Sequence, residues 1–270
     1  MADLHNVSRP PRPARWLMTA LLGCLAVVIA LGASMLVIYQ RMQPRAENLW
    51  IAAIHWPEDI PKLLAGGADV NEQNREGNTP LHLAVRFNKP ESVRLLLDAG
   101  ADPNIADFQG ETPLLSATFN AHRQVSTRIA LMLIGASADP NVHSIHADHT
   151  PLHRASKHRN LVIARALLDA GADPDALKKY DETPLHVAGS ADMVELLVAG
   201  GADIEARMHN GNTPLQLAVA RGHYDVVESL LAAGASTESE NQYGMKPIDQ
   251  RQGDERMAAL FSSATATTPE

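Results

Sequence analysis

Cysteine is almost absent from this chain of 270 residues, which contains only Cys24. One thiol cannot form a disulfide within the chain, and it cannot build a cysteine metal site. Aromatic residues are also scarce, at 4% of the chain, although 45% of it is hydrophobic. The core must therefore consist mainly of Leu, Ala, Val and Ile, which suits thin, closely stacked helices.

Basic residues are outnumbered by acidic ones. The chain has 23 Lys and Arg against 31 Asp and Glu, for a net charge of −8. The imbalance lies after residue 46, because residues 1–46 carry five arginines and a single aspartate. Phosphate contacts require clustered Lys and Arg, so we expect no nucleic-acid partner. Anionic lipid surfaces would also repel the acidic part.

Motifs of catalysis are missing as well. The sequence has no Gly-rich phosphate loop, no Cys-x-x-Cys, no His-Glu-x-x-His and no nucleophile elbow. Its recurrent aspartates follow a repeated Gly-Ala step and are interpreted as turn residues that bond the backbone. They are Asp69, Asp102, Asp139, Asp173 and Asp203. We therefore predict no enzyme activity, no cofactor and no small-molecule substrate.

Charge is absent from residues 16–40, WLMTALLGCLAVVIALGASMLVIYQ. A helix of this length would span ~37 Å, enough to cross a hydrocarbon core of about 30 Å. Trp16 and Tyr39 lie near its ends, where aromatic rings prefer the membrane interface. We predict a transmembrane helix over 16–40, with a basic tail over 1–15 and a linker over 41–46.

Two alternatives to an uncleaved anchor stay open. A cleaved signal peptide is one, although its apolar region is usually about 7–15 residues long. The other is a lipoprotein, because Leu-Leu-Gly-Cys resembles a lipidation box ending at Cys24. For an anchor, three arginines before the span and two after it favour a cytoplasmic N-terminus. We then expect a single-pass inner (plasma) membrane protein whose remaining chain lies outside, in the periplasm of a bacterium.

The rest of the chain is repetitive. Thr-Pro-Leu occurs with steps of 33, 38, 33 and 30 residues, and a degenerate copy, Lys246-Pro247-Ile248, follows 33 residues later. The motif begins at Thr79, Thr112, Thr150, Thr183 and Thr213. Gly-Ala-Asp recurs at the same period and degenerates at Ser137 and Gly234. Two landmarks with one period indicate a solenoid of stacked units.

The repeated segments TPLHLA, TPLHRA and TPLHVA resemble the ankyrin repeat. That resemblance covers roughly residues 47–260. It implies an all-α solenoid in which each unit is a β-turn loop and two antiparallel helices. The residues agree, because Thr79 is a good N-cap and Pro80 suits the first helical position. Gly100 can end the second helix with a positive φ.

The repeat domain is predicted over 47–261, with a starting cap at 47–73 and a closing cap at 241–261. Trp50 and Trp56 should cover the first face of the stack. Four extra residues before Ser137 and three fewer after Thr183 are each about one helical turn, so the inward face should survive. Residues 262–270 are small and polar, and we expect them to be disordered.

Histidines fall into two groups. His82, His153 and His186 share one repeat position, where the family resemblance implies a structural hydrogen bond. A second group, His143, His146 and His149, lies beside Asp148 in one loop. Imidazoles with a carboxylate can bind Zn²⁺ or Ni²⁺, and they can also sense pH. A polar exposed loop with ordinary histidines is the simpler interpretation.

Variable positions are the expected binding surface. The resemblance implies that partners contact the turn tips and the ends of the first helices, on a concave face. Three of the four phenylalanines fall there, and exposed aromatics anchor interfaces. We predict the binding residues Arg75, Arg86, Phe87, Phe108, Phe119, His158, Lys179, Tyr180, Arg221 and Tyr243. The alternative for the phenylalanines is a core role, in which long helices of the third repeat fold over the rings.

The predicted function is reversible protein binding by a membrane-anchored, bacterial-type ankyrin repeat protein. Such a protein would serve as an adaptor, a stress-protection factor or a neutraliser of a toxic effector. The alternative is a metal- or pH-responsive sensor that uses the loop from His143 to His149.

Overall fold

The computed structural model of the protein describes residues 47–119, 123–144 and 149–266, which belong to one compact unit, Ala46–Glu270. The predicted tail, membrane segment and linker, together with Cys24, lie outside the described residues. Within the described ranges, no helix is long and apolar enough to cross a membrane. The anchor therefore stays a prediction from the sequence.

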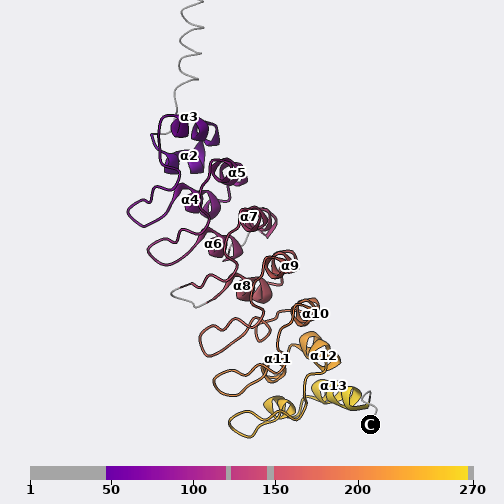
Figure 1. The fold of residues 1–270 in the computed structure, drawn as a ribbon. Helices are drawn as coiled ribbons and strands as arrows, with labels where there is room; N and C mark the ends of the chain where they lie inside the picture. The colour runs from indigo at the N-terminus through magenta and orange to yellow at the C-terminus, as the bar shows by residue number, and fades with distance from the viewer. Residues whose placement is uncertain (1–46, 120–122, 145–148, 267–270) are drawn as a thin grey trace, which may run out of the picture. The chain divides into compact units, whose positions relative to one another are not determined.

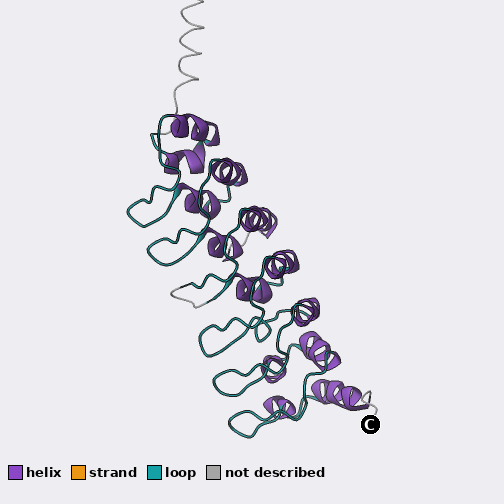
Figure 2. Ribbon diagram, viewed as in Figure 1, coloured by secondary structure: helices purple, strands orange, loops and turns teal. Residues whose placement is uncertain are grey.

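The described residues form helices joined by loops, arranged in successive pairs (Figures 1 and 2). The helices are α2 (Leu49–His55), η1 (Pro57–Asp59), α3 (Ile60–Ala65), α4 (Pro80–Arg86), α5 (Pro90–Asp98), α6 (Pro113–Phe119), α7 (Arg123–Gly135), α8 (Pro151–Lys157), α9 (Leu161–Asp169), α10 (Ala191–Ala199), α11 (Pro214–Arg221), α12 (Tyr224–Ala232), η2 (Pro247–Arg251) and α13 (Glu255–Ala266). The described part contains no named strand, only an isolated antiparallel bridge between Lys178 and Glu182. The predicted all-helical solenoid is confirmed.

Local chemistry explains where the first helices begin. Thr79, Thr150 and Thr213 each cap a helix whose first residue is proline. The threonine hydroxyl accepts a hydrogen bond from the backbone N–H three residues later. Such a cap stabilises a helix by about 1 kcal/mol. The second helices end at residues with positive φ, such as Gly100 at 86° and, where glycine is replaced, Ser137 at 63°.

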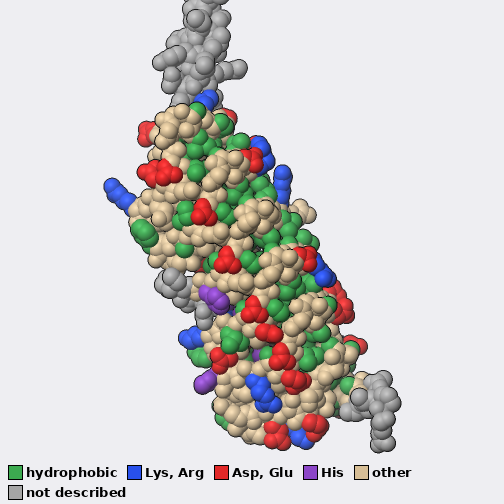
Figure 3. All heavy atoms as spheres, viewed as in Figure 1, with side chains coloured by type: hydrophobic (Ala, Val, Ile, Leu, Met, Phe, Trp, Pro, Cys, Tyr) green, Lys and Arg blue, Asp and Glu red, His purple; other side chains and the backbone are tan. Residues whose placement is uncertain are grey.

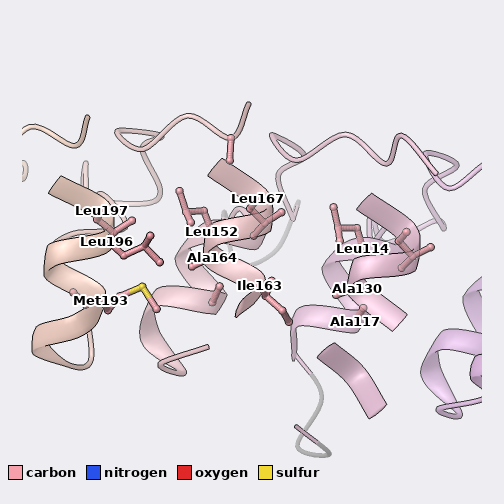
Figure 4. Close-up of a cluster of buried hydrophobic side chains, with 14 of the residues drawn as sticks. Leu114, Ala117, Ala130, Leu152, Ile163, Ala164, Leu167, Met193, Leu196 and Leu197 are labelled. Carbon is pink, nitrogen blue, oxygen red and sulfur yellow. The ribbon is translucent and has the colours of Figure 1, made fainter. Parts of the chain in front are cut away.

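The core lies between successive helix pairs. The leucine of every Thr-Pro-Leu motif is at most 1% exposed: Leu81, Leu114, Leu152, Leu185 and Leu215. Helix α4 contacts α6, and α6 contacts α8, while α5, α7, α9, α10 and α12 contact one another in the same order. Figure 4 shows leucine, isoleucine, methionine and alanine side chains from neighbouring repeats pointing toward one another. Each pair thus buries its apolar face on the next.

The two irregular repeats absorb their length changes differently. The longer repeat has a second helix of 13 residues, α7, where α5 and α9 have nine. The shortened repeat loses its first helix, and residues 184–187 form only turns. Leu185 and Val187 remain buried there, so the inward face survives as expected. Three missing residues leave too little chain for two helical turns and the connection to α10.

The ends of the solenoid depart from the repeat pattern. At the start, the chain bends at Trp56–Pro57, so the cap is a short helix pair rather than one helix. Trp56 is half-buried against the core, and the Trp50 indole donates to the Glu72 carbonyl at 3.2 Å. At the other end, Phe261 is buried on α13.

The expected boundary of the disordered tail differs from the structure. We predicted disorder from residue 262, but α13 continues to Ala266. Two serine hydroxyls follow the helical register, since Ser262 donates to the Ala258 carbonyl and Ser263 donates to that of Leu260. These bonds satisfy the two hydroxyl groups within the helix, as serine side chains in helices commonly do.

Candidate protein-binding surface

Several of the loops that carry the predicted contact residues are hydrogen-bonded to a neighbouring loop at their tips. The backbone N–H of Phe108 donates to the Glu76 carbonyl at 3.2 Å, and that of Gln242 donates to Asn210 at 3.1 Å. The His209 N–H donates to the Tyr180 carbonyl at 3.0 Å. The tips are therefore held by their neighbours and form a preorganised edge (Figure 1).

The loop bases are fixed by a second ladder. The carboxylate of Asp102 accepts the N–H of Asn104, and the Asn104 carbonyl oxygen Oδ1 then accepts the N–H of Asp139. The same carboxylate bond forms at the other aspartates of the Gly-Ala-Asp motif: Asp69, Asp139, Asp173 and Asp203. The predicted turn role of these aspartates is confirmed.

The repeated histidines join one repeat to the next. In His153, Nδ1 lies 3.4 Å from the Thr150 backbone nitrogen, while Nε2 lies 2.9 Å from the Glu182 carbonyl oxygen. His82 and His186 make the equivalent contacts. Gln216 reproduces both, because its Oε1 accepts from Thr213 and its Nε2 donates to Met245. The predicted structural role is confirmed.

The predicted aromatic contacts are exposed. Exposed fractions are 51% for Phe87, 73% for Phe108, 70% for Phe119, 62% for Tyr180 and 67% for Tyr243. Among the described residues, no helix covers these rings, so they are exposed rather than core residues. The Phe108 ring lies close against Gly77 of the previous loop, where an added Cβ would be 2.7 Å from its Cδ1.

The three predicted arginines are all exposed, and two of them are also hydrogen-bonded to neighbouring residues. Arg75 is exposed on its loop. Arg86 donates to Asn78 at 3.2 Å, and Arg221 donates to the His186 carbonyl at 3.0 Å and to Glu182 at 3.1 Å. Arg221 therefore joins two repeats, which leaves less of its guanidinium for a partner.

Two further predicted residues lie on the surface. His158 is exposed at the end of α8. The Lys179 ammonium lies 4.9 Å from the centre of the exposed Tyr180 ring.

Arg154 is an important residue that the sequence interpretation missed. Its side chain is 8% exposed and lies between two repeats. The guanidinium donates to the Leu115 carbonyl at 2.6 Å and to Glu111 at 3.0 Å. It also lies 5.2 Å from the centre of the Phe119 ring. The available signal was TPLHRA, where arginine replaces the Leu or Val of TPLHLA and TPLHVA.

A small cavity of about 40 Å³ opens beside Arg154. Its lining includes Phe119, His149, Arg154, Lys157, His158 and Lys178. Burial lowers the pKa of His149, and the nearby charges of Lys178, Arg154 and Lys157 lower it further. The cavity is therefore a basic site within an acidic chain, whose visible face carries more acidic than basic side chains (Figure 3).

The predicted metal loop is described only in part. His146 and Asp148 lie outside the described residues, and His143 is exposed. Across the described ranges, no group of three or more His, Cys, Asp or Glu residues could hold a metal ion. The basic side chains around His149 would also repel a cation.

The geometry defines a class, a helical solenoid with exposed and preorganised loop tips. Family models of ankyrin repeats match residues 63–114 (many copies), and residues 121–208 and 188–241 (three copies). The chain belongs to the ankyrin repeat family. Ankyrin repeats are, in general, protein–protein interaction modules.

Similar proteins agree on the fold. The ankyrin repeat domain of Bcl-3, a member of the IkappaB protein family, is 29% identical, with a TM-score of 0.68 over 82% of this chain and 100% of that one. The human ASB11 ankyrin repeat domain is 25% identical, with a TM-score of 0.66 over 84% and 100%. Among curated proteins, human neurogenic locus notch homolog protein 4 is 39% identical over 90 residues, 32% of this chain but 4% of its own length.

Proposed function

We propose that the chain is a membrane-anchored scaffold that binds a partner protein through its loop tips and the ends of its first helices. Residues 16–40 supply the anchor, with the N-terminus in the cytoplasm and the repeats outside. The partner is a protein that the scaffold recruits, protects or neutralises. The observation that carries the binding role is the set of exposed aromatic rings on this edge, from 51% to 73% exposed.

Physical chemistry supports this interpretation. An exposed ring leaves apolar surface in water, and burying it against a partner is favourable. Aromatic and arginine side chains dominate the energetics of known interfaces. Because several tips are hydrogen-bonded to a neighbouring tip, little conformational entropy is lost on binding, and affinity rises.

The test is crosslinked capture of a partner by the full chain from its native compartment, compared between variants. The double change Phe108→Ala and Phe119→Ala removes two rings from the edge. We expect captured partner to fall at least tenfold while the unfolding temperature changes by no more than about 2 °C. Val162→Ala, which trims a residue 56% exposed on α9, is the matched control and should capture normally.

Two results would contradict the proposal. If the double change leaves capture unaffected, the aromatic rings do not contribute to partner binding. A sharp drop in the unfolding temperature would mean that these rings stabilise the solenoid instead.

A further inference from the structure

The cavity beside Arg154 holds more positive charge than its neighbours neutralise. Arg154 pairs with Glu111, while Lys178 and Arg221 both contact the Glu182 carboxylate. Lys157 has no acidic partner within the described part of the chain. The cavity lining thus has three basic side chains, Arg154, Lys157 and Lys178, and only two of them have an acidic partner.

Two buried atoms point to an absent ligand. The Arg154 Nε and the His149 Nδ1 are buried without a hydrogen-bond partner among the described residues. A buried polar atom without a partner is costly, by about 1–3 kcal/mol. In a cavity where basic side chains converge, an anion is the ligand that supplies the missing acceptor.

The size of the cavity selects the anion. A volume of about 40 Å³ accommodates roughly three water-sized groups, at ~10–15 Å³ for each. The three heavy atoms of a carboxylate fit this volume, and a partner protein carries such groups on its Glu and Asp side chains. The exposed Phe119 ring beside the cavity can contact the methylene groups that carry a carboxylate.

We propose that this cavity binds the side-chain carboxylate of a Glu or Asp residue of the partner protein. The inference rests on the proposed function and adds the chemistry of one contact to it. The carboxylate pairs with Lys157, accepts a hydrogen bond from the Arg154 Nε–H and is attracted by Lys178, while the preceding methylenes lie on Phe119. The cavity therefore favours an acidic segment of the partner, although this chain as a whole carries a net negative charge.

Two defined peptides test the proposal, using the full chain in a neutral detergent. They are acetyl-Ala-Leu-Glu-Leu-Ala-amide and the same sequence with Gln, each fluorescently labelled. We expect the Glu peptide to bind at least tenfold more tightly in fluorescence anisotropy, and added salt to reduce that preference. Lys157→Gln should abolish the preference, and since Lys157 is exposed the variant should fold. Lys89→Gln removes the same charge from an exposed position near the start of α5 and should keep it.

Equal binding of the two peptides, or a preference that survives Lys157→Gln, would overturn the carboxylate site. So would stronger displacement of the Glu peptide by inorganic phosphate than by acetate. The proposed function is tested independently, by whether the variant with Phe108→Ala and Phe119→Ala captures less of the partner. A missing peptide preference alongside normal, aromatic-dependent capture would reject the cavity alone.

Discussion

His153 and His186 show how a single residue makes the fold sensitive to pH. Their Nδ1 atoms lie against a backbone N–H, and their Nε2–H groups donate to a carbonyl of the next repeat, so only the neutral ring fits both contacts. Burial lowers both pKa values to about 4, against the partly opposing effect of the Nε2 hydrogen bonds. The unfolded chain takes up protons first as the pH falls.

We therefore predict that stability is greatest above pH ~6.5 and falls between there and pH ~4, the window between the unfolded and folded pKa values. Each histidine should contribute a slope of about 1.4 kcal/mol per pH unit within that window. Urea unfolding at several pH values measures the slope. His153→Gln should retain both hydrogen bonds, as Gln216 does, and should remove one histidine's share. An unchanged slope in that variant would contradict the assignment.

Asp175 is a residue whose replacement should stabilise the protein. In the equivalent position, Asn104 and Asn141 donate to the carbonyls of Ser137 and Gly171, which a carboxylate cannot do. Burial raises the pKa of Asp175, as do the charges of Asp203 and Asp173, despite the hydrogen bond from the Asp203 N–H. The ionised form is therefore less favourable in the folded protein than in the unfolded chain, and this cost is present above the carboxylate range of pH and is lost as the pH falls.

Asp175→Asn should raise the free energy of unfolding by about 0.5–1.5 kcal/mol at pH 7, the value of one added hydrogen bond. The urea midpoint measures this effect, and the gain should shrink at acidic pH, where Asp175 is protonated. A variant less stable than the parent at pH 7 would disprove it.

At the scale of elements, the turn over residues 184–187 replaces a helix and brings the chain unusually close to its neighbour. An added Cβ at Gly189 would lie 2.8 Å from the Arg159 Cγ and 3.0 Å from the Lys157 carbonyl oxygen. Gly189→Ala should therefore destabilise the protein by about 1–3 kcal/mol. Gly135→Ala, at the end of α7, is the matched control, because an added Cβ there meets no atom outside its own stretch of helix within 4 Å. If Gly189→Ala and Gly135→Ala change the unfolding temperature equally, the close approach at Gly189 is refuted.

The same repeat shows what sequence patterns predict and what they miss. The period and the Thr-Pro-Leu motif predicted the stack, the N-caps and the inward leucines, because these are local and repeated. The loss of a helix after Thr183 could not be predicted in the same way. The motif spacing shows that three residues are missing, but it does not show which element loses them. Arg154 was missed for a related reason, since its partners Glu111 and Leu115 come from another repeat.

At the scale of the whole molecule, the repeats form a scaffold whose binding edge was predictable in position but not in detail. The variable positions of the phenylalanines left a binding role and a core role open, and the structure shows these rings to be exposed. The bracing of Arg221 depends on contacts between repeats, so its role could not be predicted from one repeat. Membership of the ankyrin family agrees with an edge that varies while the buried framework stays constant.

The anchor gives the last prediction at this scale. A span over 16–40, with a basic tail before it, should place the C-terminus outside the cytoplasm. In a bacterial host, alkaline phosphatase fused after Glu270 should be active, whereas green fluorescent protein at the same position should stay dark. Replacing Arg9, Arg12 and Arg15 with Glu should reverse the membrane orientation of part of the protein population, because these charges set the orientation.

Membrane extraction and mass measurement separate the anchor from its alternatives. An uncleaved anchor keeps the full mass and requires detergent for release, and Cys24→Ser leaves both unchanged. A shortened chain that is released without detergent would indicate signal-peptide cleavage. A mass increase that depends on Cys24 would indicate lipidation, and either result would replace the transmembrane helix while leaving the binding edge of the solenoid as it is.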